Sequence, residues 1–221
     1  MAKSRSYRLL CPIARGLDAI GDRWTLLILR DLHAGPARFT DLQTGLTGIA
    51  ANLLTDRLAK LTQDGLMTKS DGQHGAALYQ LTDRGRRTRD ILFELALFGG
   101  GQPAPEDRVK PGNLRTVATT LGAAAARTAL PDVGITAELR VDGEAISLTV
   151  RDGAAEATYG SATQPDVVLD TSYDALLKVS EGEITLMDFA TTHSSIQVNT
   201  PGKDQQFMQV MQQILEQFQQ V

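Results

Sequence analysis

One segment of this chain restricts the possible folds more than any other. Within residues 50–64, Leu54, Leu58 and Leu61 recur at the spacing that places them on one side of an α-helix, with polar residues opposite. Gly65 follows, where a residue that tolerates a left-handed backbone ends a helix at least cost. Taken alone, the segment predicts an ordinary amphipathic helix. Its meaning depends on the elements before and after it.

The residues before this helix contain the start signals of three others. Cys11-Pro12 opens one, because proline at the first helical position loses no hydrogen bond. Asp22 can cap a second helix over 24–32. The sequence Thr40-Asp-Leu-Gln is a capping box, in which hydroxyl and amide satisfy each other's backbone donors. We therefore expect a short third helix from Thr40, immediately before the segment 50–64.

The residues after Gly65 predict a hairpin and a closing helix. Residues 66–69 and 77–81 alternate between apolar and polar side chains, and turn-forming residues separate them. Thr82 then caps a helix that continues to about Phe98. Successive helices followed by a hairpin and a further helix within 100 residues form the winged helix-turn-helix arrangement, mainly α with a β wing.

Glycine and proline interrupt all periodicity between residues 99 and 112, which predicts a surface linker between two domains. The length of 221 residues fits two domains of about 100 residues each. The charge changes sign across the linker. Residues 1–100 contain 14 Lys and Arg against 10 Asp and Glu, and residues 101–221 contain 8 against 16. An anionic polymer is therefore tolerated by the first half and repelled by the second.

The second half predicts an α+β domain. The runs 136–141 and 145–150 alternate on either side of Asp142-Gly143, a strong signal for a two-residue hairpin turn. Further strands are expected at 154–159, 167–170 and 196–198, and helices at 114–130, about 172–180, 183–190 and 203–219. Because strands in sequence order are joined by tight turns, we expect a mainly antiparallel sheet with helices on one face.

Composition excludes several classes of protein. No apolar run approaches the roughly 20 residues that span a bilayer, and the N-terminus lacks the apolar core of a signal peptide. The single cysteine cannot form an internal disulfide, so we expect a cytoplasmic protein without membrane insertion. Three scattered histidines, and no P-loop or Gly-x-Gly-x-x-Gly motif, predict no metal, no cofactor and no catalytic residues.

The first half also carries a specific combination of motifs. They are Cys11-Pro-Ile, Leu17-Asp-Ala-Ile-Gly-Asp-Arg-Trp24, Leu27-Ile-Leu-Arg-Asp-Leu32, Gly35-Pro-Ala-Arg-Phe39, Leu53-Leu-Thr-Asp-Arg-Leu58, Asp64-Gly-Leu66 and Tyr79-Gln-Leu-Thr82. With these motifs, residues 8–98 resemble the HxlR family of bacterial transcription regulators. The resemblance implies that residues 1–98 form a DNA-binding and dimerisation domain. It further implies a homodimer, built from the first helix and the helix after the wing, on a roughly palindromic operator.

The same resemblance makes the segment 50–64 the recognition helix, whose first turns enter the major groove. Asn52, Thr55 and Arg57 match positions that the family uses on DNA, and Arg38 lies beside the phosphates. Asn52 is suited to reading adenine. The candidate DNA contacts are Arg38, Thr40, Ala51, Asn52, Thr55, Asp56, Arg57, Gln73 and His74.

Two positions depart from the family pattern. Ala50-Ala51 stands where the family commonly has a serine cap, and Asp56 brings a carboxylate that can accept a hydrogen bond from cytosine but repels phosphate. Gln73 and His74 at the wing tip are either DNA contacts or solvated turn residues. Cys11 lies where some family members carry a redox- or electrophile-sensing cysteine, and the alternative is an unreactive cysteine at a helix start.

The motifs of the second half are less specific than those of the first. They are residues 170–183, Met187, residues 196–198 and the terminal amphipathic helix. With them, residues 112–219 resemble a sterol-carrier-protein-like (SCP-2-type) domain. The resemblance implies an apolar cavity between sheet and helices for a hydrophobic small molecule. The candidate lining residues are Leu176, Met187, Phe189, Phe207, Met208 and Met211, and for each the alternative is a role in the core.

The leading prediction is a DNA-binding transcription regulator, not an enzyme, whose second domain (residues 113–221) senses a hydrophobic effector and changes half-site spacing by linkage. In one alternative, the second domain is a dimerisation module without a ligand. In the other, the chain is a lipid-binding or lipid-transfer protein. The positive charge of the first half argues against that last alternative.

Overall fold

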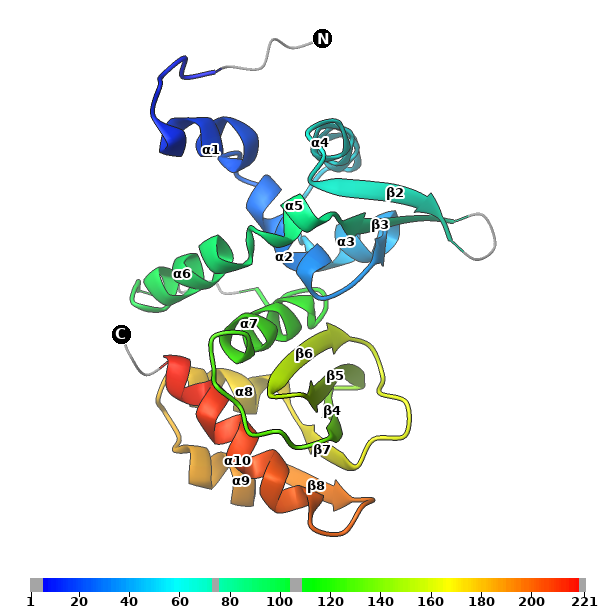
Figure 1. Ribbon diagram of the computed structural model, residues 1–221, viewed down its shortest axis with the longest axis vertical. Coiled ribbons are helices and arrows are strands. Elements are labelled where there is room, and N and C mark those ends of the chain that lie inside the picture. The colour runs from blue at the N-terminus through cyan, green and yellow to red at the C-terminus, as the bar shows by residue number, and fades with distance from the viewer. Residues whose placement is uncertain (1–5, 73–75, 104–108, 219–221) are drawn as a thin grey trace. The chain divides into compact units, whose positions relative to one another are not determined.

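The computed structural model describes residues 6–72, 76–103 and 109–218 (Figure 1). By its internal contacts the chain divides into two compact units, residues 1–92 with 110–112, and residues 93–109 with 113–221. The boundary falls inside a helix, because α6 (Arg89–Gly100) continues through it. The linker expected from residue 99 therefore begins later, since Gly99 and Gly100 still belong to the last turn of α6, where glycine costs least.

The first unit has helices followed by a two-stranded wing. Its elements before α6 are α1 (Pro12–Ile20), α2 (Thr25–His33), β1 (Ala37–Arg38), α3 (Phe39–Gly45), α4 (Ala51–Gln63), β2 (Met67–Asp71), β3 (Ala77–Leu81) and α5 (Asp83–Arg86). All pairings are antiparallel, in the order β1-β3-β2, and Figure 1 shows the β2–β3 hairpin extending beyond the helices. This order confirms the predicted winged helix-turn-helix, with α3 and α4 as its helix pair.

The apolar stripe predicted from the sequence is what anchors α4. Leu54, Leu58 and Leu61 are at most 2% exposed, and they pack in one core with Ile28 and Leu29 of α2. Burial of each leucine contributes about 1.5–3 kcal/mol relative to leaving it in water. The opposite face of α4 is consequently turned outward.

The start of α3 differs from the predicted capping box. Strand β1 keeps the backbone extended through Arg38, so Arg38 and not Thr40 is the N-cap residue. The carboxylate of Asp41 accepts a hydrogen bond from the Arg38 backbone N–H at 2.8 Å, which satisfies one donor at the helix start. A strand of two residues has no periodicity, which is why the sequence pattern does not predict β1.

The helix after the wing is interrupted. Thr82 caps α5 as predicted, and its hydroxyl oxygen accepts the Gly85 N–H at 3.1 Å. The prediction of one continuous helix is wrong, because α5 ends at Arg86 and a separate helix, α6, begins at Arg89. Thr88 is buried in the break, and its hydroxyl donates to the Gly85 carbonyl at 2.7 Å.

The second unit contains a five-stranded sheet in the order β6-β5-β4-β7-β8. Its elements after α6 are α7 (Arg115–Ala125), β4 (Ile135–Val141), β5 (Glu144–Arg151), β6 (Ala154–Tyr159), β7 (Val167–Thr171), α8 (Tyr173–Ser180), α9 (Leu186–Thr192), β8 (Ser194–Val198), α10 (Lys203–Leu215) and the 3-10 turn η2 (Glu216–Phe218). Helix α7 packs on β6, and α10 packs on β4, β7 and β8 (Figure 1).

The sheet is mixed, which corrects the expectation of strands joined in chain order. β4, β5 and β6 do pair antiparallel through Asp142-Gly143 and Asp152-Gly153, and all four turn residues have the positive φ that such Asp-Gly turns require. β7, however, pairs parallel with β4 and antiparallel with β8. A parallel pair needs a crossover connection, and no local pattern shows which strand receives it.

Candidate nucleic-acid interface

The turn between α3 and α4 is short and fixed to the core. Leu46 and Ile49 are buried, and the Ile49 N–H donates to the Leu46 carbonyl at 3.0 Å. Gly48 has a φ of +92°, a conformation that strongly favours glycine. Helix α4 then starts at Ala51, and the N-cap residue Ala50 supplies no side-chain acceptor. The backbone N–H groups of its first turn are therefore open to a bound anion.

The outward face of α4 carries most of the predicted base contacts. Ala51, Asn52, Thr55 and Asp56 are all exposed. Asn52, Thr55 and Asp56 are neighbours on the helix surface, because they are spaced i, i+3 and i+4. The Thr55 hydroxyl donates to the Ala51 carbonyl at 2.9 Å, so its oxygen remains an acceptor. The structure thus brings an amide, a hydroxyl and a carboxylate together on one exposed surface.

Arg57 is separated from the other predicted contacts on α4. Its Nε donates to Oδ1 of Asp22 and its Nη2 donates to Oδ2, both at 2.7 Å. Asp22 lies between α1 and α2, and it also accepts the Trp24 backbone N–H at 3.1 Å at the start of α2, where the sequence predicts a cap. The Arg57 guanidinium is therefore held against the fold and does not lie with Asn52 and Thr55.

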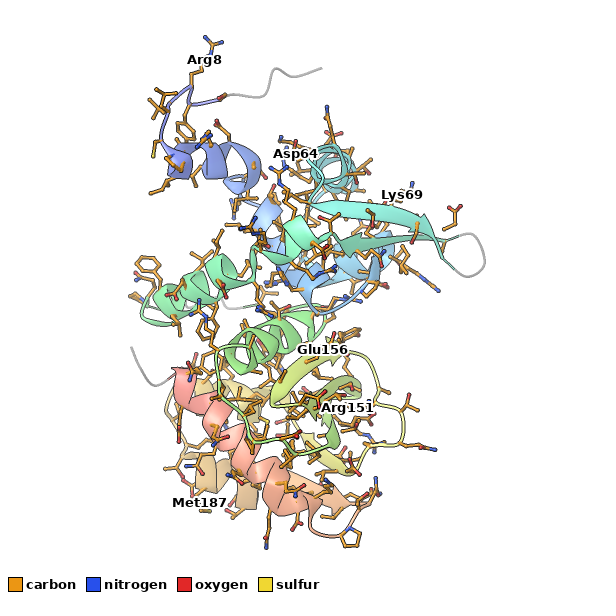
Figure 2. All side chains as sticks on the ribbon, in the orientation of Figure 1. Arg8, Asp64, Lys69, Arg151, Glu156 and Met187 are labelled. Atoms are coloured by element: carbon orange, nitrogen blue, oxygen red, sulfur yellow. The ribbon has the colours of Figure 1, made fainter. Side chains whose placement is uncertain are left out.

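Two of the remaining predicted contacts lie at the start of α3. The side chains of Arg38 and Thr40 are exposed. Gln73 and His74 lie outside the described residues. The sequence interpretation missed Lys69, which is exposed on β2 (Figure 2). The available signal was a basic side chain on the predicted hairpin.

A half-buried histidine links α2 to the break between α5 and α6. His33 Nε2 lies 3.0 Å from the Thr88 hydroxyl oxygen. Because that hydroxyl already donates to the Gly85 carbonyl at 2.7 Å, the histidine must donate from Nε2–H. Burial, together with the positive charges of Arg89 and Arg86, lowers the pKa of His33 from 6.5 to about 4. The ring is therefore neutral at pH 7.

We expect His33 to make the folded state less stable as the pH falls. The unfolded chain binds a proton at His33 below pH about 6.5, whereas the folded state resists protonation until pH about 4. The contribution of the neutral ring to the free energy of unfolding is therefore fully present above pH 6.5 and decreases between pH 6.5 and 4. The total decrease is about 2 kcal/mol after allowance for partial solvent exposure. In urea unfolding experiments across this pH range, the free energy of unfolding of His33→Gln should depend less on pH than that of the wild type. Identical pH slopes would contradict this account.

Cys11 is exposed at the N-cap position of α1, and its backbone carbonyl accepts the Arg15 N–H at 3.2 Å. Exposure is one requirement of a sensing thiol. The sensor role stays a prediction.

The predicted apolar lining of the second unit is divided among different environments. Phe207 and Phe189 are 0% and 7% exposed, so the alternative of a core role fits both. Met187 is 71% exposed on α9 and points outward (Figure 2). The other three are half-buried, namely Leu176, Met208 and Met211. The lining role of these residues stays a prediction.

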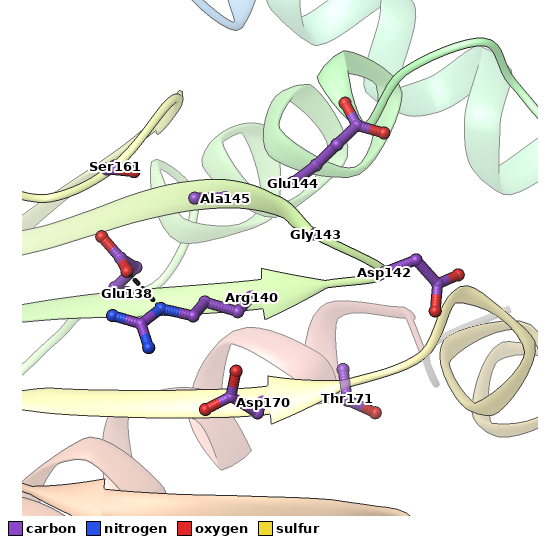
Figure 3. Close-up of a pocket in the computed structure, with 9 residues that line it drawn as sticks. All are labelled: Glu138, Arg140, Asp142, Gly143, Glu144, Ala145, Ser161, Asp170 and Thr171. Carbon is purple, nitrogen blue, oxygen red and sulfur yellow. Dashed lines mark hydrogen bonds and ion pairs between the residues drawn. The ribbon is translucent and has the colours of Figure 1, made fainter.

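A pocket of about 370 Å³ in the second unit is lined mostly by polar residues and contains none of the predicted residues (Figure 3). Its lining residues are Glu138, Arg140, Asp142, Gly143, Glu144, Ala145, Ser161, Asp170 and Thr171. Glu138 is buried, and its two oxygens accept from Arg140 Nε at 2.6 Å and from the Ala162 N–H at 2.7 Å. These contacts satisfy the buried carboxylate within the fold.

Among the helices of the described residues, none is long and apolar enough to cross a membrane.

Comparison with known proteins gives the same picture of the first half. Residues 19–106 match the model of the HxlR-like helix-turn-helix family. The chain is 30% identical to the uncharacterized HTH-type transcriptional regulator sll1512 of Synechocystis, over 41% of this chain and 68% of that protein. It is 40% identical to Rv3095 of Mycobacterium tuberculosis, over 42% of this chain and 61% of that protein. It is 30% identical to YdzF of Bacillus subtilis, over 42% of this chain and 89% of that protein.

The chain thus spans between about three fifths and nine tenths of these relatives, and each match covers less than half of this chain. All three relatives are named as transcription regulators, which agrees with the expectation that the chain is not an enzyme. The family match includes the whole of α2, α3, α4 and the wing. Through this winged helix-turn-helix region, the chain belongs to the HxlR-like helix-turn-helix family of transcription regulators.

Proposed function

We propose that this chain acts as a homodimer that binds a roughly palindromic DNA operator, with α4 in the major groove. The observation that carries this proposal is the division of α4 into two faces. Leu54, Leu58 and Leu61 are buried, while Asn52 and Thr55 are exposed immediately after a short turn from α3. A recognition helix needs this combination, because one face must be held rigidly while the other reaches base edges.

The exposed residues divide into base contacts and phosphate contacts. Asn52 reads adenine through its amide, Asp56 accepts from cytosine, and Thr55 suits either kind of base pair. Ala51 has only a methyl group, which suits contact with thymine. Arg38 and Thr40 at the start of α3, and Lys69 on the wing, contact phosphates. Gln73 and His74 remain candidates for DNA contacts, with solvated turn residues as the alternative.

Exposed apolar side chains support the dimer. Ile13 and Leu17, spaced i and i+4 on one side of α1, are 74% and 47% exposed, and Leu10, two residues before the helix, is 99% exposed. We call these three residues the α1 stripe. On α6, Leu95 and Phe98 are 46% and 67% exposed. Contiguous apolar residues in water mark an interaction surface, and a second copy of the chain would cover them.

Operator binding can be tested with a duplex that the wild-type protein enriches from a random library. Asn52→Ala should weaken binding to this duplex by about 5- to 150-fold, because one bidentate base contact carries about 1–3 kcal/mol of discrimination. Arg38→Ala should instead weaken all duplexes alike and reduce the slope of log K against log salt by about 1. Fluorescence anisotropy across a salt series measures both effects.

The matched control is Gln63→Ala, because it also removes an exposed amide from α4 but at the last residue of the helix. Its affinity should equal that of the wild type. The proposal fails if the wild type enriches no sequence, or if its binding shows no dependence on salt.

The effector role of the second unit stays a prediction from its resemblance to SCP-2-type domains. Of the predicted lining residues, Met187 is exposed and Leu176, Met208 and Met211 are half-buried, so a hydrophobic molecule needs less rearrangement to reach these four than to reach Phe189 or Phe207. Dimerisation without a ligand, and lipid transfer, remain the alternatives. The net negative charge of residues 101–221 suits a domain that does not contact DNA.

A further inference from the structure

We infer that the ion pair between Arg57 and Asp22 sets the angle of α4 relative to α1, and thereby the half-site spacing that the dimer accepts. This inference rests on the function proposed above. It gives Arg57 a positioning role in place of the base contact expected from the sequence.

The geometry of the pair is that of a rigid connection. Two parallel hydrogen bonds of 2.7 Å join the guanidinium to both carboxylate oxygens. Such a two-point contact fixes the relative orientation of the groups as well as their distance. The side chains of Arg57 and Asp22 are 27% and 38% exposed, so both are partly shielded from water.

The Asp22 end of the connection is itself held in place. The same carboxylate accepts the Trp24 N–H at 3.1 Å. The preceding residue, Gly21, donates its N–H to the Leu17 carbonyl at 2.8 Å. A β-carbon at Gly21 would lie 2.6 Å from the Leu17 carbonyl oxygen, so the chain leaves α1 through a tight turn. Asp22 is thus fixed with respect to α1 and to α2.

The Arg57 end lies away from the surface that would read bases. With 3.6 residues per turn, Arg57 lies about 140° around α4 from Asn52, whereas Thr55 and Asp56 lie within about 60° of Asn52. Arg57 therefore connects the back of the recognition helix to the turn that follows the α1 stripe. In a dimer that closes through this stripe, the pair relates each recognition helix to the two-fold axis.

Half-site spacing is sensitive to such an angle. One base pair moves a half-site by about 3.4 Å along the DNA and by about 34–36° around it. A recognition helix that is held at one angle accepts one spacing. Without the ion pair, α4 keeps its buried leucine face but can tilt enough to accept a spacing that is one base pair longer or shorter.

The test compares wild type, Asp22→Ala, Arg57→Ala and the double variant. Each is titrated with the duplex selected by the wild type and with versions whose centre is one base pair longer or shorter. The preference of the wild type for its own spacing should fall by about tenfold in either single variant and no further in the double variant, because both substitutions remove the same contact. Asp22→Glu, which keeps a carboxylate, should recover part of the preference.

Lys60→Ala is the matched control. This substitution removes an ion pair of 2.8 Å between Lys60 and Asp64. Asp64 is the C-cap residue of α4, so this pair does not connect α4 to another helix. The spacing preference should therefore be unchanged. Circular dichroism and sedimentation velocity on every variant verify that folding and dimerisation persist.

Three outcomes overturn the inference in distinguishable ways. If the spacing preference is unchanged in folded Asp22→Ala and Arg57→Ala, the connection has no such role. If Arg57→Ala loses discrimination at one base pair and Asp22→Ala does not, Arg57 is a base contact after all. If the wild type selects no duplex, the proposed function fails, and this inference fails with it.

Discussion

Replacement of Ile13 by aspartate is expected to abolish dimerisation, and with it tight operator binding, while the monomer stays folded. Ile13 is 74% exposed in the isolated chain, so the substitution costs the monomer little. In a dimer that buries the α1 stripe, the new carboxylate would lose its water without gaining a partner, at a cost of about 3–5 kcal/mol. The dimer dissociation constant should rise by at least about 100-fold. Sedimentation equilibrium measures this constant, and anisotropy measures the accompanying loss of affinity for DNA.

Arg15→Asp is the matched control, because it places a carboxylate on the same helix about 200° around from Ile13. Arg15 is also exposed. This variant should remain a dimer. If Ile13→Asp sediments like the wild type at all concentrations, the α1 stripe is not the dimer surface, and the exposed residues of α6 become the next surface to substitute.

Gly85→Ala is expected to lower the free energy of unfolding of the first unit by about 3 kcal/mol or more. A β-carbon on Gly85 would lie 2.0 Å from the Leu66 carbonyl oxygen and 3.1 Å from a methyl carbon of Leu81. The Leu66 carbonyl is backbone, and it already accepts the Thr82 N–H at 3.1 Å, so it cannot move without breaking that bond. Urea unfolding followed by fluorescence of Trp24, the single tryptophan, reports on this unit.

Gly16→Ala provides the comparison for this effect within the same unit. Gly16 is also helical, and a β-carbon there would meet nothing within 4 Å. Alanine should therefore leave stability unchanged or raise it by up to about 1 kcal/mol, since it has the higher helix propensity. If the two variants unfold at the same urea concentration, the close approach of α5 to the Leu66 carbonyl does not contribute to stability.

The local elements of this protein are largely readable from its sequence. The Leu54, Leu58 and Leu61 repeat predicts α4 and its buried face, and Asp142-Gly143 predicts the β4–β5 turn. In each case the signal and the structure that it specifies lie within a few residues, so periodicity and turn chemistry are sufficient. Because the order of such elements is characteristic of winged helices, the fold of the first unit also follows from the sequence, and the motifs of residues 8–98 carry its resemblance to the HxlR family.

The parts that the sequence does not determine are contacts between residues far apart in the chain. Arg57 has the residue type and the helix position of a DNA contact, and only its pairing with Asp22, 35 residues earlier, gives it another partner. The N-cap of α3 depends on the pairing of β1 with β3, and the mixed sheet depends on where β7 meets β4. The predicted pocket residues share a composition, but their burial is set by how α9 and α10 pack.

What the sequence by itself determined is therefore the set of elements, their order, and the apolar faces that must be buried. The tertiary structure alone decided which of the predicted DNA contacts are exposed and which are paired within the fold. The physical reason is that a hydrophobic repeat is satisfied by any apolar partner, whereas an ion pair or a strand pairing needs one particular partner at one distance and angle. Those partners are chosen only when the whole unit packs together.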